Sequence, residues 1–212
     1  RLVGSEMCIR DRRKIGEVLR EPFAIHGLKE NVSEAITKLL DQVGLSSDYV
    51  NRYSHEMSGG QLQRVGIARA IALNPTLVVA DEPVSALDVS IQAQIINLMM
   101  DFREKMGIAF LFISHDMSIV EYFCDRVAVM YLGKIVEIAT SEEIYKRPEH
   151  PYTEALLNAV PGLDSAQKKQ KLKVRGDIPD SSNPPKGCSF NTRCPLKEKQ
   201  CEEIEPNLKE IA

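Results

Sequence analysis

The sequence predicts an α/β fold built on a parallel sheet. Two apolar runs, residues 77–80 and 108–113, are unbroken rather than alternating, which is typical of strands that are covered on both faces. Between them, apolar side chains recur at helical spacing from Ile91 to Met106, and Gly107 ends the pattern. A strand, a helix and a strand in this order form a βαβ unit, whose two strands lie parallel.

Helices are predicted before the first strand. Ser33 can cap a helix whose apolar side chains recur at helical spacing and which Gly44 ends. Ser58 can cap a second helix, over residues 62–73, which leads directly into the first strand. The region before residue 76 is therefore predicted to be helical.

A β-hairpin and a loop-rich extension are predicted after the second strand. Residues 127–131 and 134–138 are typical of two strands joined through Leu132 and Gly133. From residue 161 onward, prolines, serines and charged residues replace the periodic apolar pattern, which favours loops.

The composition excludes several classes of protein. Lys and Arg number 27 against 30 Asp and Glu, a net charge of −3, so no basic excess indicates a nucleic-acid partner. The longest apolar runs have six residues, whereas a membrane-spanning helix needs about 20. Five cysteines in 212 residues are too few for a disulfide scaffold. We therefore expect a globular protein without a membrane span or a nucleic-acid partner.

Candidate catalytic residues follow the two predicted strands. Asp81 and Glu82 come directly after the first strand, and His115 stands two residues after the second. The carboxyl ends of parallel strands meet at one edge of a sheet, where ligands bind. One carboxylate there can hold Mg²⁺ while the other activates a water molecule. The alternatives are a helix cap for the acidic pair and an ordinary surface residue for the histidine.

A candidate anion site precedes the helix over residues 62–73. Ser58, Gly59, Gly60 and Gln61 stand at its start, and two glycines let the backbone approach a ligand closely. The free N–H groups and the positive dipole end of a helix N-terminus attract anions. The alternative is a flexible turn that only caps a buried helix.

Four motifs resemble those of ABC-type ATPases, in the family's order and spacing. Residues 57–61 resemble the signature motif, with Met57 in place of the usual leucine, and residues 77–83 resemble the Walker B strand. Residues 85–88 are similar to the D-loop, and residues 113–116 to the switch histidine segment. This resemblance implies an α/β fold of the P-loop NTPase (ABC ATPase) type, present in part, with a parallel sheet core and a helical subdomain.

Three further segments resemble the tail of importer ATPases. Residues 150–153, 183–185 and 187–195 are similar to the corresponding parts of ATP-binding subunits that serve oligopeptide, dipeptide and nickel importers. The resemblance implies an ATPase subunit that energises uptake of peptides or nickel from the cytoplasmic face of the cell membrane. The implied partners are membrane permease subunits and a second ABC ATPase subunit, in a homodimer or a heterodimer.

The resemblance also implies roles for single residues, with ATP and Mg²⁺ as cofactors. Asp81 would help to position Mg²⁺, Glu82 would polarise the attacking water, and His115 would contact the γ-phosphate. The nucleotide-binding residues would be Ser58, Gly59, Gly60, Gln61 and Asp88, of which Ser58, Gly59 and Gly60 would cover the γ-phosphate of ATP held by the opposite subunit. Asp88 would couple the two sites of the dimer.

The P-loop of the family and the glutamine-bearing loop that normally precedes its helical subdomain are missing from this sequence. A P-loop needs G-x-x-x-x-G-K-[ST], whose amides and lysine hold the phosphates. The only Gly-Lys pair, Gly133-Lys134, is followed by Ile135. We therefore expect a chain truncated before its Walker B half, without appreciable ATPase activity alone. The alternative is a non-catalytic or degenerate module that completes a partner's ATP site through its signature motif.

The resemblance divides the chain into four parts. Residues 1–12 form a leader that does not resemble the family, and residues 13–75 form the helical subdomain with the signature motif. Residues 76–160 form the Walker B and switch half of the core. Residues 161–212 form the C-terminal extension, which contains proline and cysteine.

Three cysteines of the extension form a candidate metal site. Cys188, Cys194 and Cys201 have the spacing C-x₅-C-x₆-C, whereas structural zinc sites begin with C-x₂₋₄-C. Iron–sulfur clusters usually take four thiolates, and some related importer ATPases hold a [4Fe–4S] cluster with a further cysteine downstream. A [4Fe–4S] cluster, free or partly paired thiols, and zinc all remain open.

Overall fold

The computed structural model describes residues 12–160, 174 and 176–210. The leader expected over residues 1–12 lies almost wholly outside these residues, as does the first part of the expected extension, residues 161–173. The chain packs as two compact units, Arg1–His115 and Asp116–Ala212. Each unit is described by itself. The four-part division expected from the motifs remains a prediction.

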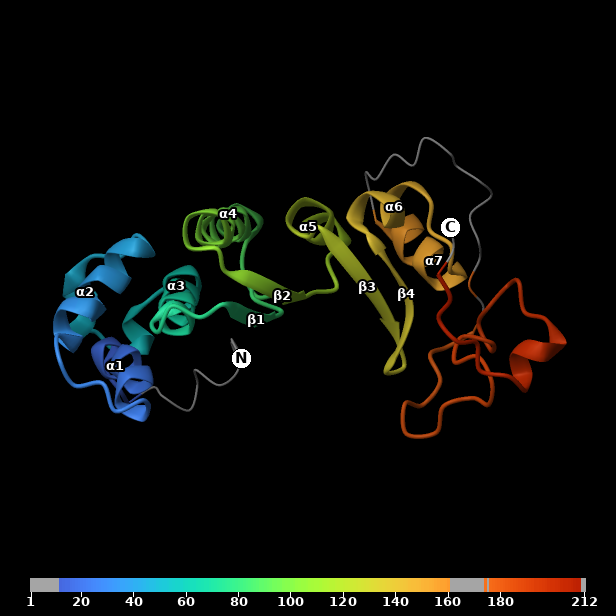
Figure 1. The fold of residues 1–212 in the computed structure, drawn as a ribbon, viewed down its shortest axis with the longest axis horizontal. Helices are drawn as coiled ribbons and strands as arrows, with labels where there is room; N and C mark the ends of the chain where they lie inside the picture. Colours follow the sequence, from blue (N-terminus) through green and yellow to red (C-terminus); the bar gives the residue numbers. More distant parts are fainter. Residues whose placement is uncertain (1–11, 161–173, 175, 211–212) are drawn as a thin grey trace. The chain divides into compact units, whose positions relative to one another are not determined.

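From residue 12 onward, the first unit combines four α-helices, two short 3₁₀ helices and a pair of strands (Figure 1). The signature segment, residues 57–61, includes the start of α3 (Gly59–Ile71), and the candidate catalytic residues lie at or just after the ends of β1 (Leu77–Asp81) and β2 (Ala109–Ile113). The elements in chain order are α1 (Ile15–Ile25), α2 (Val32–Gln42), η2 (Ser47–Asn51), η3 (Ser54–Glu56), α3 (Gly59–Ile71), β1 (Leu77–Asp81), α4 (Val89–Met106) and β2 (Ala109–Ile113).

Polar side chains of α3 attach this helix to its neighbours. Arg69 donates to Glu21 Oε2 of α1 at 2.9 Å. Arg64 donates to the Val43 carbonyl at the end of α2 at 2.7 Å, and to Gln94 Oε1 of α4 at 3.1 Å. The middle and the C-terminal part of α3 are therefore held by contacts with three other helices.

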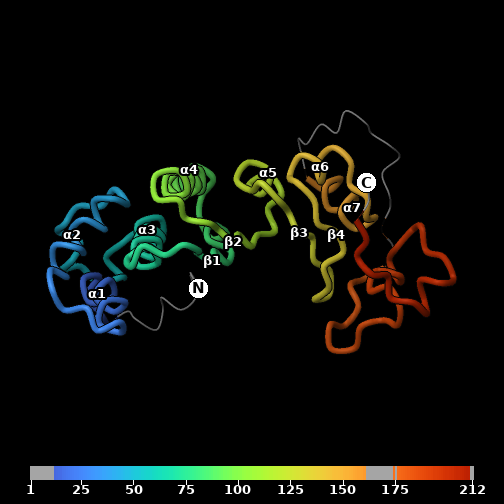
Figure 2. Tube along the Cα trace, in the orientation of Figure 1, coloured from blue at the N-terminus to red at the C-terminus, as the bar shows by residue number. Residues whose placement is uncertain are grey.

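The predicted βαβ unit is confirmed. Strands β1 and β2 pair in parallel, with Leu77 opposite Ala109 and Asp81 opposite Ile113. Helix α4 connects them and ends at Gly107, whose φ is +67°. Figure 2 follows the chain from α3 into β1 and through α4 to β2.

The expectation that both faces of these strands are covered is wrong for the described chain. Val78 and Ala80 are buried, but Leu77, Leu111 and Ile113 are 55%, 53% and 45% exposed. Successive side chains of a strand point to opposite faces, so one face packs within the unit and the other is open. The unbroken apolar run correctly indicated a strand, but it could not show how many faces are covered within this chain.

The expected cap at Ser33 is also wrong. Helix α2 begins at Val32, after Asn31, which adopts a left-handed conformation with φ of 54°. Ser33 lies inside the helix, where its carbonyl accepts a hydrogen bond from Thr37 Oγ1. Asparagine tolerates the left-handed region better than most residues, and this sets the start of the helix one residue before Ser33. Gly44 follows the end of the helix as expected, with φ of +72°.

The second unit is built around the predicted hairpin, which is confirmed. Strands β3 (Arg126–Tyr131) and β4 (Lys134–Thr140) pair antiparallel, with a bulge between Val129 and Met130. The remaining elements in chain order are α5 (Met117–Phe123), α6 (Ser141–Lys146), α7 (Pro151–Ala159) and η4 (Lys199–Glu202). After α7, η4 is the one helical element in the described part of the chain, so the loop-rich extension is also confirmed there.

Phe190 anchors the C-terminal extension on the hairpin. Its side chain is fully buried and lies 5.1 Å from the ring of Tyr131 in β3 and 5.4 Å from the ring of Tyr152 in α7, centroid to centroid. The adjacent Asn191 donates to the carbonyls of Lys186 and Cys201. Phe190 therefore packs the described extension against the hairpin, while the Asn191 amide joins parts of the extension to each other.

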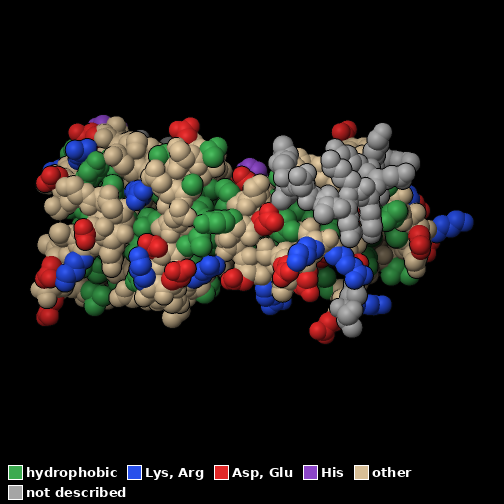
Figure 3. All heavy atoms as spheres, turned by 90° about the horizontal axis from the view of Figure 1, so that it is seen from above, with side chains coloured by type: hydrophobic (Ala, Val, Ile, Leu, Met, Phe, Trp, Pro, Cys, Tyr) green, Lys and Arg blue, Asp and Glu red, His purple; other side chains and the backbone are tan. Residues whose placement is uncertain are grey.

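The surface carries charges of both signs. On the face drawn in Figure 3, acidic and basic side chains are interspersed among apolar ones. Within the described ranges, none of the helices combines the length and the hydropathy that crossing a bilayer requires.

Candidate functional site

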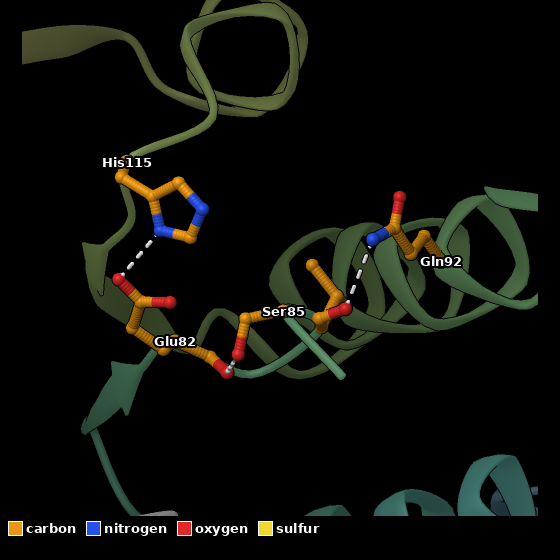
Figure 4. Close-up of polar contacts among 5 residues, drawn as sticks. Glu82, Ser85, Gln92 and His115 are labelled. Carbon is orange, nitrogen blue, oxygen red and sulfur yellow. Dashed lines mark hydrogen bonds and ion pairs between the residues drawn. The ribbon is translucent and has the colours of Figure 1, made fainter. Parts of the chain in front are cut away.

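Glu82 and His115 are in direct contact. Glu82 Oε1 and His115 Nδ1 lie 2.8 Å apart, and Figure 4 shows the two side chains turned toward each other. Glu82 directly follows β1, and His115 stands two residues after β2. The expectation that these residues share one edge of the sheet is confirmed. Both side chains face solvent, with 41% of Glu82 and 75% of His115 exposed.

The backbone at Glu82 turns sharply away from the strand. Its φ is 49°, in the left-handed region that side chains other than glycine rarely adopt. Its N–H donates to the Ile113 carbonyl at 2.9 Å, and its carbonyl accepts from the Ser85 hydroxyl at 3.2 Å (Figure 4). These hydrogen bonds hold the Glu82 backbone in place. They therefore fix the point at the end of β1 from which the side chain projects.

Asp81 supplies a second carboxylate beside Glu82. It is the last residue of β1, lies opposite Ile113 in the register, and is half-buried. Among the residues that the structure describes, no three Cys, His, Asp or Glu side chains are grouped so that they could hold a metal ion by themselves. Mg²⁺ is usually held by one or two carboxylates together with water and substrate phosphates. The carboxylates at this edge fit a Mg²⁺ ion whose other ligands are water and the phosphate oxygens of a bound ligand.

The segment after Glu82 leads into α4 through a defined turn. Gln92 Nε2 donates to the Val84 carbonyl at 3.0 Å (Figure 4). Asp88, which is exposed, is the N-cap residue of α4, and its carbonyl accepts the N–H groups of Ile91 and Gln92. Asp88 is thus presented at the start of a helix whose first turn is fixed.

The predicted cap at Ser58 is confirmed, and Gln61 completes it. Ser58 Oγ accepts the N–H of Gln61 at 3.3 Å, and Gln61 Oε1 accepts the N–H of Ser58 at 3.0 Å. This reciprocal pair is a capping box. It leaves the N–H groups of Gly59 and Gly60 outside the box, at the positive end of the α3 dipole.

The two glycines allow α3 to approach the segment that begins α4. A Cβ at residue 60 would lie 2.6 Å from Ile91 Cγ2, and a Cβ at residue 59 would lie 3.4 Å from Leu87 Cδ2. Ser58 and Gly59 are exposed, whereas Gly60 is half-buried. Close packing therefore explains Gly60, while Gly59 remains open to a ligand.

The three cysteines of the extension lie near one another, but as free thiols. The Cys188 N–H donates to the Cys201 carbonyl at 2.9 Å, and no disulfide joins Cys188, Cys194 and Cys201. Burial raises the pKa of the Cys194 thiol, and the neighbouring Cys188 and Cys201 raise it further. Metal centres bind the thiolate, and these cysteines are not among any metal-binding group of the described residues. The structure gives a [4Fe–4S] cluster or zinc no support.

Sequence reasoning missed several residues around the candidate site. Tyr49 and Arg64 contact the α3 region through side-chain hydrogen bonds, and Gln92 fixes the turn after Glu82. Their partners stand 8 to 30 positions away in the chain, so no local spacing indicated these contacts.

Comparison with known families gives two matches. Residues 2–85 match the family model described as "ABC transporter", and residues 136–201 match "Oligopeptide/dipeptide transporter, C-terminal region". The chain therefore resembles the ATP-binding proteins of ABC transporters over these two ranges. Proteins of this ATPase family use ATP together with Mg²⁺.

Curated relatives match almost all of this chain. A Brucella ovis protein, provisionally named as a peptide import ATP-binding protein, is 54% identical over 202 residues. The oligopeptide transport ATP-binding protein of Bacillus subtilis is 49% identical over 205 residues, and the dipeptide transport ATP-binding protein of Haemophilus influenzae is 48% identical over 202. These alignments cover 94% to 95% of this chain, and the chain spans 62% to 64% of the length of these relatives.

A solved structure has the same fold. It is provisionally described as a metal-chelate type ABC transporter in an inward-facing conformation. The TM-score is 0.61 with 22% sequence identity, over 70% of this chain and 59% of the other. This likeness supports the ABC ATPase fold of P-loop NTPases. In general, ATP-binding subunits of ABC importers dimerise, work with membrane permease components and are membrane-associated.

Proposed function

We propose that this chain belongs to an ATP-hydrolysing subunit that energises uptake of peptides across the cytoplasmic membrane. The observation that carries the proposal is the contact between Glu82 and His115 at the carboxyl edge of two parallel strands. The names of the relatives favour peptides over nickel as the transported substrate. In this proposal the chain acts at the cytoplasmic face, beside permease subunits and a second ATPase subunit.

Glu82 serves as the general base. Its exposed carboxylate accepts a proton from a water molecule, which attacks the γ-phosphorus of ATP and releases ADP and inorganic phosphate. The ring of His115, held through Nδ1 by Glu82 Oε1, presents its other nitrogen to the γ-phosphate. Asp81 would help to hold Mg²⁺, which would neutralise charge on the phosphate oxygens.

The signature segment acts on the site of the opposite subunit. The Ser58 hydroxyl and the N–H groups of Gly59 and Gly60 can donate to a γ-phosphate at the exposed start of α3. Gln61 and Asp88 belong to the same surface, and Asp88 couples the two sites of the dimer. Because these contacts exist only when ATP is present, association of the subunits depends on nucleotide.

A second function is favoured by one observation. The 212 residues contain no G-x-x-x-x-G-K-[ST] segment, which is the element that grips the triphosphate. The chain can then act as a module that completes a partner's ATP site through Ser58, Gly59 and Gly60, without hydrolysing ATP itself.

A fusion tests the first function. A P-loop-bearing N-terminal half of an ABC ATPase subunit is joined ahead of residue 13, and Mg²⁺-dependent ATP hydrolysis is measured. The change Glu82→Gln should lower turnover roughly a hundredfold to ten-thousandfold, as expected for loss of a general base. Glu104→Gln, at an exposed position of α4, is the matched control and should leave turnover unchanged. Equal activity of the two variants would refute the role of Glu82.

The unmodified chain tests the second function. It is mixed with a complete ABC ATPase subunit whose own signature serine has been replaced. If the chain acts as a module, the partner's turnover rises on mixing, and Ser58→Arg abolishes the increase while Glu82→Gln does not. No increase on mixing would rule out this function.

A further inference from the structure

The side chain of Gln61 bridges the signature segment to a distant tyrosine. Its Oε1 accepts the Ser58 N–H at 3.0 Å, and its Nε2 donates to the Tyr49 hydroxyl at 2.9 Å. Gln61 is half-buried, and each end of its amide has a fixed partner. The side chain that the family resemblance assigns to nucleotide contact is therefore occupied within the chain.

Tyr49 is itself held on a rigid support. It lies in η2, where the guanidinium of Arg52 stacks over its ring at 4.2 Å from the centroid. The Arg52 carbonyl accepts the N–H of Ile15 at 2.9 Å, at the start of α1. Gly16 of α1 packs against Val50, so closely that a Cβ would lie 2.6 Å from Val50 Cγ1. The Tyr49 hydroxyl thus has a defined position relative to the first helix.

The Tyr49 hydroxyl holds the Gln61 amide in the orientation that Ser58 requires. The Ser58 N–H can only donate, so it needs Oε1 as its acceptor, and this directs Nε2 at the Tyr49 hydroxyl, which accepts. The reversed amide would place an NH₂ donor against the Ser58 N–H, leaving both donors without an acceptor. Losing the hydroxyl removes the contact that anchors the Nε2 end of the amide.

We propose that Tyr49, steadied by Arg52, is a positioning residue for the signature segment and acts through Gln61. It touches no nucleotide and instead fixes the capping box that orients Ser58, Gly59 and Gly60. This inference rests on the proposed function, because the orientation of the segment matters only where it meets ATP. Gln61 accordingly orients the segment and is not a ligand of the phosphate.

Amide hydrogen exchange of the full chain, measured by NMR, tests the proposal without any nucleotide. Tyr49→Phe removes one neutral hydrogen bond, so the Ser58 amide should exchange roughly two- to tenfold faster. The Ile67 amide, in the buried part of α3, should keep its rate, because only the start of the helix loosens. Tyr53→Phe, which deletes a hydroxyl four positions along, is the matched control and should change neither rate.

Variants of Gln61 separate positioning from packing. In Gln61→Glu, the Tyr49 hydroxyl can donate to one carboxylate oxygen while the other accepts the Ser58 N–H, so exchange at Ser58 stays slow. In Gln61→Leu, exchange becomes fast, and adding Tyr49→Phe has no further effect, because the two residues act through one contact. An unchanged Ser58 rate in Tyr49→Phe, or additive effects of the two changes, would overturn the proposal.

A second readout links the positioning to ATP. The affinity of the chain for a P-loop-bearing ABC ATPase subunit is measured with ATP under non-hydrolysing conditions. Tyr49→Phe should weaken it roughly two- to tenfold, and Tyr53→Phe should not. If even the unchanged chain fails to associate, the proposed function fails, while the exchange rates at Ser58 still decide whether Tyr49 positions this segment. Association weakened equally by both tyrosine variants would overturn the proposal.

Discussion

Gly60 of α3 lies directly against Ile91 of α4, and a Cβ at residue 60 would stand 2.6 Å from Ile91 Cγ2. Isoleucine is branched at Cβ and cannot easily turn its Cγ2 away. The start of α3 can thus pack against the first turn of α4 only because Gly60 has no Cβ.

The first prediction is that Gly60→Ala destabilises the first unit. The added methyl group forces the two helices apart, at a cost of about 1–3 kcal/mol in the free energy of unfolding. Urea denaturation followed by circular dichroism measures this change. Gly59→Ala, whose Cβ meets Leu87 at an ordinary 3.4 Å, should change the free energy by less than about 0.5 kcal/mol. Gly60→Ala should cost less free energy of unfolding in a chain that already carries Ile91→Ala, which removes the clashing Cγ2. An equal cost in both backgrounds would contradict the prediction.

The second prediction is that the purified chain alone does not hydrolyse ATP appreciably. Glu82, His115 and Asp81 supply a base, a phosphate contact and a carboxylate for Mg²⁺, but no P-loop neutralises and holds the triphosphate. Release of inorganic phosphate in the presence of Mg²⁺ measures the activity. Mg²⁺-dependent turnover that Glu82→Gln abolishes would contradict the prediction, whereas turnover that survives this change would indicate a contaminating enzyme.

The third prediction concerns pH and His150, the N-cap residue of α7. Burial lowers the pKa of His150, although the Glu137 carboxylate acts in the opposite direction. The ring also contacts Phe190, and its Nδ1 accepts the Tyr152 N–H. In the unfolded chain His150 has a pKa of about 6.5, so below that pH the unfolded state binds the proton more readily. The free energy of unfolding should therefore fall as the pH drops through about 6.5.

The matched variant for this prediction is His150→Asn, because asparagine also accepts an N–H at a helix N-cap but does not titrate. Unfolding midpoints in urea between pH 5 and pH 8 give the comparison. The wild-type chain should lose more stability toward pH 5 than the variant does. Identical pH profiles of the two chains would contradict the prediction.

The fourth prediction is that Phe190→Ala releases the described extension from the hairpin. Removing a fully buried phenylalanine costs about 3–5 kcal/mol, and its loss exposes the rings of Tyr131 and Tyr152. Limited proteolysis should then cut within residues 176–210 much faster than in the wild-type chain. Leu196→Ala, at a position 62% exposed in the same segment, should leave the cleavage rate unchanged. Equal cleavage of both variants would mean that Phe190 does not anchor the segment.

Those parts of the fold that depend on local patterns could be predicted from the sequence. The unbroken apolar runs gave β1 and β2, and helical spacing ending at Gly107 gave α4. Because parallel strands end at one edge, the meeting of Glu82 and His115 followed from their positions alone. The capping box at Ser58 and Gln61 likewise has a local signature.

The rest depends on contacts that no local pattern encodes. Asn31 rather than Ser33 precedes α2, because the backbone there is left-handed. The open face of β1 and β2 reflects which elements pack on the sheet, and hydrophobicity alone does not reveal that. Gln61 meets Tyr49 across twelve positions of the chain, and such a pairing appears only once the helices are placed.

At Glu82, the left-handed backbone makes the carboxylate that the proposed reaction needs costly to the stability of the fold. A side chain other than glycine costs roughly 1–2 kcal/mol in that conformation. Selection for stability alone would therefore favour glycine at residue 82, and the carboxylate that faces His115 would be lost. A glutamate that persists there in an evolving lineage reports continued demand for its charge.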